Sequence, residues 1–351
     1  MGPAPGARRA LSLLAVTLVL SMSTWLSATA VLAQLKDEWG LSSAAGSWLT
    51  IAVQLGFVMG ALVSSIVNLP DLLPPARLIA ASASGAAVVN VLLITVGSAG
   101  PAIALRFATG FLAAGIYPPA LKLISTWFKT GRGVAVGILV GALTLGTASP
   151  HLINAVGDLE WETVVVGASL LSLAGAAIAL SVPEGPFPFP RATFDPRQLR
   201  RTLGNRGVRL ASLGYFGHMW ELYGAWAWMH IFFTDVTNGD ARAGATIAFA
   251  IVGIGAIGCY LGGRLGDTWG RTRTTAAAMA ISGTCALVIG WLGNSPSWVV
   301  VTVGLVWGLT VIADSAQFST IVTELADQAY VGTAVTLQMA VGFTLTVITI
   351  W

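Results

Sequence analysis

The sequence predicts an all-α integral membrane protein with two pseudo-symmetric six-helix bundles, the second of which is short by one helix. Three observations lead to this prediction. Only 9% of the 351 residues are charged and the mean hydropathy is +0.79, whereas a soluble domain is about 25% charged. Apolar runs of about 20 residues, each long enough to cross a bilayer as a helix, recur along nearly the whole chain. Short patterns from the first half also return in the second half.

Hydropathy and turn residues together predict eleven spanning helices. The first apolar run continues well past the length of a secretory signal and lacks a small-residue cleavage site, so we expect it to be retained as a span. The predicted spans are 10–35, 42–68, 77–98, 101–124, 133–156, 162–182, 208–233, 244–264, 274–293, 297–322 and 330–351.

One stretch rich in proline and arginine, PEGPFPFPRATFDPRQLRRTLGNR, lies between the sixth and seventh predicted spans. Its prolines disfavour a continuous helix and its arginines need water or lipid headgroups. We therefore expect an N-terminal bundle over 1–182, a cytoplasmic loop over 183–207 and a C-terminal bundle of five spans over 208–351.

The distribution of lysine and arginine predicts the orientation. With the N-terminus inside, 15 of the 18 cationic residues fall on the cytoplasmic side, as the positive-inside rule requires. We expect a multi-pass protein of a bacterial cytoplasmic membrane with its N-terminus in the cytoplasm. The same bias accounts for the net charge of +3 without a nucleic-acid partner.

Internal repetition supports two related halves, because several weak matches occur at nearly one offset. Duplicated units of this kind are typical of transporters with a site at the repeat interface. The matches are Gly110 with Gly308 at an offset of 198, Gly133 with Gly332 at 199, and Asp71 with Asp267 and Arg77 with Arg273 at 196.

A cluster of charge, GGRLGDTWGRTRT over 262–274, follows the eighth predicted span. A carboxylate close to arginines can clasp two helix ends together and stabilise one of two domain positions. The cluster resembles the loop signature G-x-L-x-D-x-x-G-R-R/K of the major facilitator superfamily, although Thr272 replaces the second cation. The matching residues are Gly263, Leu265, Asp267, Gly270 and Arg271, and the displaced cation is Arg273.

The loop after the second span, SSIVNLPDLLPPARL, keeps only part of that signature, namely Asp71 and Arg77. The alternative for both loops is that they merely follow the positive-inside rule. Three other stretches are similar to the same superfamily: RFATGFLAAGIYPPALKLISTWFKTGRG with its R-x-x-x-G, GILVGALTLGTASPHL with its spaced glycines, and GYFGHMWELYGAWAW, which resembles bacterial members near the nitrate/nitrite and cyanate porters.

The resemblance implies a secondary transporter with twelve helices and a site between two rocking bundles. Because only eleven spans are found before Trp351, we expect a chain truncated before its twelfth helix. It also implies that Arg106, in the R-x-x-x-G motif, serves proton coupling or substrate attraction. A planar guanidinium suits anionic groups, which favours an organic or inorganic anion as substrate. The alternative for Arg106 is a side chain that bonds to backbone carbonyls or reaches the interface.

An ionisable side chain inside a bilayer costs about 2.5–3.5 kcal/mol on insertion scales, so each one needs an explanation. Glu221 lies in the middle of the seventh span with His218 three residues before it. A carboxylate and an imidazole in an apolar helix can share a proton, so this pair is our first candidate for proton symport. The alternative is a structural pair that fixes this helix against its neighbours.

Asp314 and Gln317 lie in the tenth span, and the offset of 198 places Asp314 opposite Ile116, next to Tyr117. We expect these residues to line a central cavity, with a polar lock between helices as the alternative. Tyr223 and Trp226 are further candidates for the cavity wall, although such aromatic residues are also common anchors at membrane interfaces.

The sequence contains no metalloprotease H-E-x-x-H motif and no phosphate-binding G-x-x-x-x-G-K-[ST] motif. Cys259 and Cys285 both lie in apolar runs, which supports neither a disulfide nor a metal site. We therefore predict a monomeric transporter, not an enzyme, without cofactor or metal, whose partners are a small-molecule substrate, protons and the lipid bilayer. The alternatives are a membrane sensor or assembly factor on the same scaffold and a lipid-modifying membrane enzyme.

Overall fold

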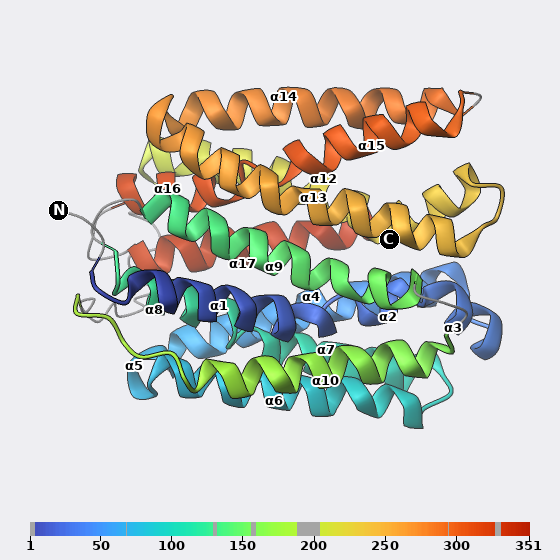
Figure 1. Ribbon diagram of the computed structural model, residues 1–351, viewed down its shortest axis with the longest axis horizontal. Helices are drawn as coiled ribbons and strands as arrows, with labels where there is room; N and C mark the ends of the chain where they lie inside the picture. Colours follow the sequence, from blue (N-terminus) through green and yellow to red (C-terminus); the bar gives the residue numbers. More distant parts are fainter. Residues whose placement is uncertain are drawn as a thin grey trace.

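The computed structural model describes residues 4–67, 69–128, 132–155, 159–187, 204–293, 295–326 and 331–351. All regular structure in these ranges is helical, and most of the helices lie side by side along one direction (Figure 1). Much of the predicted loop 183–207 lies outside the described residues, so its ends remain a prediction. We name the two ends of the bundle after residues that lie there, the Arg271 end and the Arg242 end.

The N-terminal half contains short helices as well as long ones. Its elements are α1 (Ala7–Ser21), η1 (Met22–Thr24), α2 (Ser27–Ala30), α3 (Leu32–Trp39), α4 (Ser43–Ile66), α5 (Leu69–Leu72), α6 (Pro75–Val91), η2 (Leu92–Thr95), α7 (Ala99–Ala113), α8 (Tyr117–Ser125), α9 (Arg132–Ala155) and α10 (Trp161–Ala179).

The C-terminal half begins with the longest of the described helices, of 31 residues. Its elements are α12 (Arg206–Val236), α13 (Ala241–Thr268), α14 (Arg271–Ile289), η4 (Gly290–Leu292), α15 (Ser297–Val311), α16 (Ser315–Leu325) and α17 (Val331–Ile350).

Each of the eleven predicted spans corresponds to one helix or to a run of consecutive helices. Within the described residues, nine helical stretches are long and apolar enough to cross a membrane, and α12 and α17 occupy the places of the other two. Three predicted spans are interrupted. The first is divided into α1, η1, α2 and α3, the fourth into α7 and α8, and the tenth into α15 and α16.

The interruption of the fourth span has a local cause in the sequence. Pro118 and Pro119 lie in the first turn of α8, where proline is tolerated because the missing N–H has no partner inside the helix. The same residues cannot continue a helix that arrives from α7. In the tenth span, Asp314 precedes the first residue of α16, a position that favours a short polar side chain.

The two halves repeat each other at the offset that the sequence predicts. α4 and α13 begin 198 residues apart, as do α7 and α15, and α8 and α16. The interruption therefore occurs at the same place in both halves, which confirms their pseudo-symmetry.

Glycine contacts repeat at the same offset. A Cβ atom on Gly110 would lie 1.8 Å from the carbonyl oxygen of Val53, and one on Gly308 would lie 2.0 Å from that of Ile251. Only glycine permits such an approach of two helix backbones. Because both partners are 198 residues apart, the second and fourth spans pack as the eighth and tenth do.

Two helix pairs make the broadest contacts between the halves. α9 packs against α13 through small residues, since a Cβ atom on Gly137 would lie 2.7 Å from the carbonyl oxygen of Cys259. α4 packs against α17, where the hydroxyl of Thr346 donates to the side-chain oxygen of Gln54. Figure 1 shows α9 beside α13.

Candidate functional site in the membrane interior

The interruption between α15 and α16 places a buried carboxylate next to a histidine of α12. Nδ1 of His218 lies 2.8 Å from Oδ1 of Asp314, and the two side chains are 0% and 2% exposed. The pair lies within ion-pair distance, but the two atoms do not form a hydrogen bond, and Nε2 of His218 also lacks a hydrogen-bond partner. Two aromatic rings, Tyr215 and Phe318, lie 6.0 and 5.9 Å from the imidazole. The pair is therefore desolvated and only partly satisfied by the protein.

Glu221 has different partners from those we predicted. Nε1 of Trp307 donates to one carboxylate oxygen at 2.7 Å, and the hydroxyl of Ser282 donates to the other at 3.1 Å. These contacts tie α12 to α15 and α14, and the ion pair of His218 is with Asp314. The hydrogen bonds of Glu221 thus go to other helices instead of to His218, because the direction of each side chain around α12 decides which neighbouring helix it meets. A joint role of the two residues in proton coupling stays a prediction.

Three tyrosines surround the centre of the molecule. Tyr117 lies at the start of α8, as the offset predicts, and is partly buried. Tyr215 and Tyr223 of α12 belong to the buried apolar core against which Tyr117 packs. Residues of both halves therefore contribute to the same core, which Tyr215 joins beside His218.

A group of aromatic rings closes the centre between the halves. Trp25 lies 5.3 Å from Phe57 and 6.0 Å from Phe343, and Tyr223 lies 5.4 Å from Phe343 and 5.8 Å from Trp226. All five rings are buried. Tyr223 and Trp226, our candidate wall residues, thus lie inside the molecule, away from the membrane interface.

Arg106 is fully buried and bound to the N-terminal half through each of its three nitrogens. Nη1 donates to the Thr24 carbonyl and to Oδ1 of Asn90, both at 2.9 Å, and Nε lies 3.4 Å from the Leu49 carbonyl. Nη2 donates to the carbonyl of Trp25. The carbonyls of Thr24 and Trp25 lie where the first span is interrupted, after η1, so the arginine donates to backbone groups that the interruption leaves without helical partners, whereas the Leu49 carbonyl belongs to α4. This arrangement matches the structural alternative considered for Arg106.

Several other buried polar atoms of the interior have no hydrogen-bond partner. Nε1 of Trp25 and Nε2 of Gln54 are buried without a hydrogen-bond partner, as are both side-chain polar atoms of Gln338 on α17. Buried polar groups are normally paired, so these atoms are available to water or to a solute.

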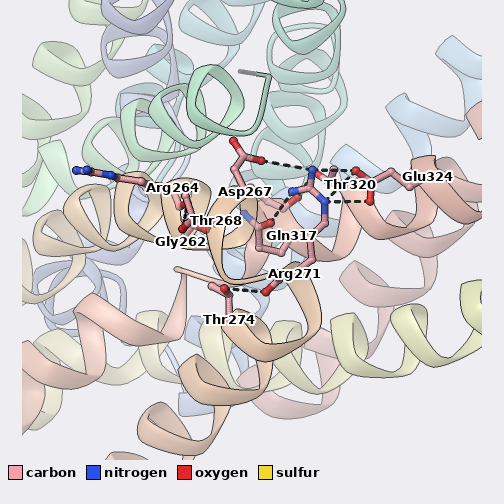
Figure 2. A network of polar contacts seen from close by, with 11 residues as sticks. Gly262, Arg264, Asp267, Thr268, Arg271, Thr274, Gln317, Thr320 and Glu324 are labelled. Atoms are coloured by element: carbon pink, nitrogen blue, oxygen red, sulfur yellow. Dashed lines mark hydrogen bonds and ion pairs between the residues drawn. The ribbon is translucent and has the colours of Figure 1, made fainter. Parts of the chain in front are cut away.

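The charged loop forms the expected clasp, with one more member than we predicted (Figure 2). Arg271 lies 2.8 Å from Glu324 of α16 and 3.5 Å from Asp267 at the end of α13. Its Nη1 also donates to Oε1 of Gln317 at 2.9 Å, and Nε2 of Gln317 lies 3.2 Å from the Gly262 carbonyl. The clasp thus joins α13, α14 and α16 and includes Gln317, whose place in the substrate pathway stays a prediction.

Two positions of the signature require glycine, each for a different structural reason. Gly270 has a φ of +100°, a region that favours glycine, and the turn starts α14 directly at Arg271. A Cβ atom on Gly263 would lie 2.8 Å from the Gly133 carbonyl of α9. The loop therefore lies against the N-terminal half, where an interdomain clasp is expected to act.

Two further members of the predicted gating loops, Arg273 and Arg77, have no contact with the clasp among the described residues. Arg273 and Arg77 are both exposed, and the side chain of Asp71 lies outside the described residues. The structure therefore shows the clasp of the second half, whereas a corresponding clasp between Asp71 and Arg77 in the first half stays a prediction.

Sequence reasoning missed Glu324 and Asn90. Glu324 lies at the end of the tenth span, where an acidic residue is common in a loop and does not indicate a site. Asn90 is a single amide in an apolar helix. The signal for Asn90 was the cost of burying an amide. Among the described residues no three His, Cys, Asp or Glu side chains are placed to hold a metal ion.

Comparison with known proteins agrees with this architecture. The family profile of the Major Facilitator Superfamily matches residues 13–349. The MFS-type transporter hasB of Aspergillus fumigatus is 26% identical over 282 residues, which are 74% of this chain and 59% of that protein. The MFS-type transporter pytF of Aspergillus terreus is 27% identical over 46% of this chain and 55% of that protein. The chain thus spans little more than half the length of either relative.

Solved structures share the fold. A bacterial homologue of the human lysosomal transporter Spinster superposes with a TM-score of 0.69 at 16% identity, covering 98% of this chain and 81% of that one. The proton:xylose symporter XylE superposes with a TM-score of 0.73 at 12% identity, covering 99% and 88%. A relation to the nitrate/nitrite or cyanate porters stays a prediction. The family match over almost the whole chain, together with its two pseudo-symmetric halves, establishes that this chain belongs to the Major Facilitator Superfamily.

Proposed function

We propose that the protein is a secondary transporter that moves a small polar solute by alternating access and is driven by protons. Membership of the superfamily and two relatives named as transporters support the transport of a solute. The distribution of lysine and arginine supports a place in the cytoplasmic membrane with the N-terminus inside.

The observation that carries proton coupling is the pair of His218 and Asp314. A carboxylate and an imidazole 2.8 Å apart in a desolvated place can hold a proton between them or release it when the surroundings become hydrated. The pair lies on α12 and at the start of α16, beside the rings through which the two halves meet. A change in the position of the halves would therefore change the solvation of the pair.

Our proposal does not specify whether the solute is anionic, cationic or neutral. The preference for an anion depended on Arg106, and its nitrogens are bound to carbonyls and to Asn90. The other features of the interior are aromatic rings, unpartnered amides and one carboxylate. A neutral or cationic solute fits such an interior as well as an anion does.

The clasp around Arg271 would stabilise one position of the halves. It holds the ends of α13, α14 and α16 together at the Arg271 end, and the end of α13 lies against Gly133 of α9. Separation of α9 from α13 would leave the clasp without that support.

The test is uptake into proteoliposomes from a panel with equal numbers of anions, cations and neutral solutes, with and without an inward proton gradient. For any solute that wild type accumulates, Asp314→Asn is expected to abolish accumulation against a gradient and to keep downhill flux. The amide keeps the size of the side chain but cannot exchange a proton near neutral pH.

Glu221→Gln is the matched control. A glutamine oxygen can still accept the hydrogen bond of Trp307, so uphill uptake is expected to remain. Uphill uptake that survives in Asp314→Asn but is lost in Glu221→Gln would transfer the coupling role to Glu221. If the protein accumulates no solute from the panel, with or without the proton gradient, the alternative of a membrane sensor or assembly factor would be favoured.

A further inference from the structure

Two histidines from different halves lie ring against ring near the Arg242 end. His151 belongs to α9 and His230 to α12, and their ring centroids are 5.6 Å apart with planes inclined at 74°. The two residues are 1% and 7% exposed. Neither belongs to the central pair described above, so these rings form a separate titratable contact between the halves.

The rings have few polar partners. A ring nitrogen of His230 lies 3.3 Å from the Ala241 carbonyl, and Nδ1 of His151 is buried without a hydrogen-bond partner. No acidic side chain of the described residues forms an ion pair with either ring. The contact therefore favours two neutral imidazoles, because a buried imidazolium beside another has no counter-charge.

Charged groups on the surrounding elements are engaged elsewhere or lie outside the contact. Asp240 caps the start of α13 by accepting from the Ala243 N–H, and Glu38 accepts from Nε1 of Trp161. Nε of Arg242 donates to the Ala155 carbonyl at 2.9 Å and so links α13 to the end of α9. The other charged residues near the Arg242 end of these elements are Lys36, Asp37, Glu160, Glu162 and Asp235, and the remaining charged residues of α12 and α13 are Arg206, Arg209, Glu221, Arg264 and Asp267.

A hollow of about 90 Å³ reaches this place. That volume has room for water, and its polar lining consists of Gln34, Asn154, His230 and Arg242. The one charged side chain in the lining is a cation. Water in the hollow would give protons a route to His230, and Arg242 would add to the repulsion once a ring is charged.

We propose that His151 and His230 form a proton-binding site that keeps the Arg242 end closed while both rings are neutral and opens it when they are protonated. Separation of α9 from α12 would hydrate both rings, so the open arrangement binds protons more tightly than the closed one. By linkage, a fall in pH shifts the population towards the open arrangement. This inference rests on the alternating access proposed above, since it requires open and closed positions of this end.

The test measures the distance between two spin labels as a function of pH in lipid nanodiscs. Ala44 and Ser297 are exposed positions near this end, one in each half, and are replaced by cysteine. The native cysteines, Cys259 and Cys285, are replaced by alanine. The size of the response depends on how much higher the pKa of the histidine site is in the open arrangement than in the closed one. For each unit of that difference, the ratio of open to closed molecules is expected to rise about tenfold between pH 8 and pH 5.

Three variants decide the outcome. The double variant His151→Gln/His230→Gln is expected to lose the dependence on pH, whereas Arg273→Gln, at an exposed position outside both histidine sites, keeps it. His151→Arg, which places a side chain that stays protonated against His230, is expected to populate the open distance already at pH 8.

Two results would overturn the inference. One is an unchanged response to pH in the double variant, and the other is an Arg242 end that opens to the same extent at pH 8 and pH 5. An end that opens at no pH and in no variant would instead contradict alternating access itself.

Discussion

The two halves differ most clearly at one repeated position, which holds Arg106 in the N-terminal half and Gly304 in the C-terminal half, 198 residues later. The arginine side chain reaches to the carbonyls of Thr24 and Trp25. At Gly304 the space is filled by Phe233, whose ring atoms would lie 2.7 Å from an added Cβ atom. A donor-rich side chain thus occupies the place that an aromatic ring occupies in the other half.

The helices that face these positions differ accordingly. The first span is interrupted after Ser21, whereas α12 runs without a break from Arg206 to Val236. A helix interruption leaves carbonyl groups without partners inside the helix, and Arg106 supplies donors for them. Gly304 supplies none, so an interruption at this depth of α12 would leave its carbonyls buried and unpaired.

The other ionisable residues are distributed in the opposite way. His218, Glu221 and Asp314 occupy the positions that Leu20, Ser23 and Ile116 occupy in the N-terminal half. The charge of the N-terminal half is saturated with hydrogen bonds, whereas the pair of the C-terminal half has unpartnered ring nitrogens. The buried charge of the first half is thus bound to backbone carbonyls and an amide, whereas His218 of the second half has no hydrogen-bond partner, and our proposal of proton coupling depends on this difference.

The largest effect is expected from Arg106→Met. The change leaves the Trp25 carbonyl buried without a donor, at about 1–3 kcal/mol for a group left unsatisfied, and removes one donor each from Oδ1 of Asn90 and from the Thr24 carbonyl, which still accepts from Ser27. We expect loss of the folded protein, measured as monodisperse yield and thermal unfolding in detergent. Arg273→Met, at an exposed arginine, is the control. A variant of Arg106 that folds normally but no longer transports would show that this arginine acts on the solute or the proton.

An intermediate effect is expected from Gly110→Ala and Gly308→Ala. The added methyl groups would lie 1.8 and 2.0 Å from the Val53 and Ile251 carbonyls, so the helices must separate. Overpacking of this kind costs about 1–3 kcal/mol, and both changes should lower the thermal midpoint to a similar extent. Gly97→Ala and Gly283→Ala, which would meet no atom within 4 Å, are the controls. A large difference between Gly110→Ala and Gly308→Ala would break the symmetry of the two halves.

The smallest effect is expected from Arg271→Ala compared with Arg77→Ala. Arg271 loses its contacts with Glu324, Asp267 and Gln317, and partly exposed ion pairs contribute about 0–1 kcal/mol each. Arg77 is exposed, so its removal should change the unfolding midpoint by less. Glu324→Gln should reproduce the effect of Arg271→Ala. Equal midpoints for Arg271→Ala and Arg77→Ala would show that the clasp adds nothing to stability.

Much of the architecture could be predicted from local patterns. Apolar runs identified the spans because burial in lipid requires about 20 consecutive apolar residues in a helix. The offset of 198 placed Asp314 opposite Ile116, next to Tyr117, and the signature around Arg271 predicted a clasp. These features depend on residues close together in the chain or on a repeated pattern.

The sequence by itself determined the membrane helices, their duplication and the residues that bear charge inside them. Only the tertiary structure decided the partners of those charges: Asp314 for His218, Trp307 for Glu221, and the carbonyls of an interrupted helix for Arg106. The physical reason is that a partner is selected by the rotation and depth of helices distant in sequence. Hydropathy gives the length of each helix but not the direction in which its side chains face.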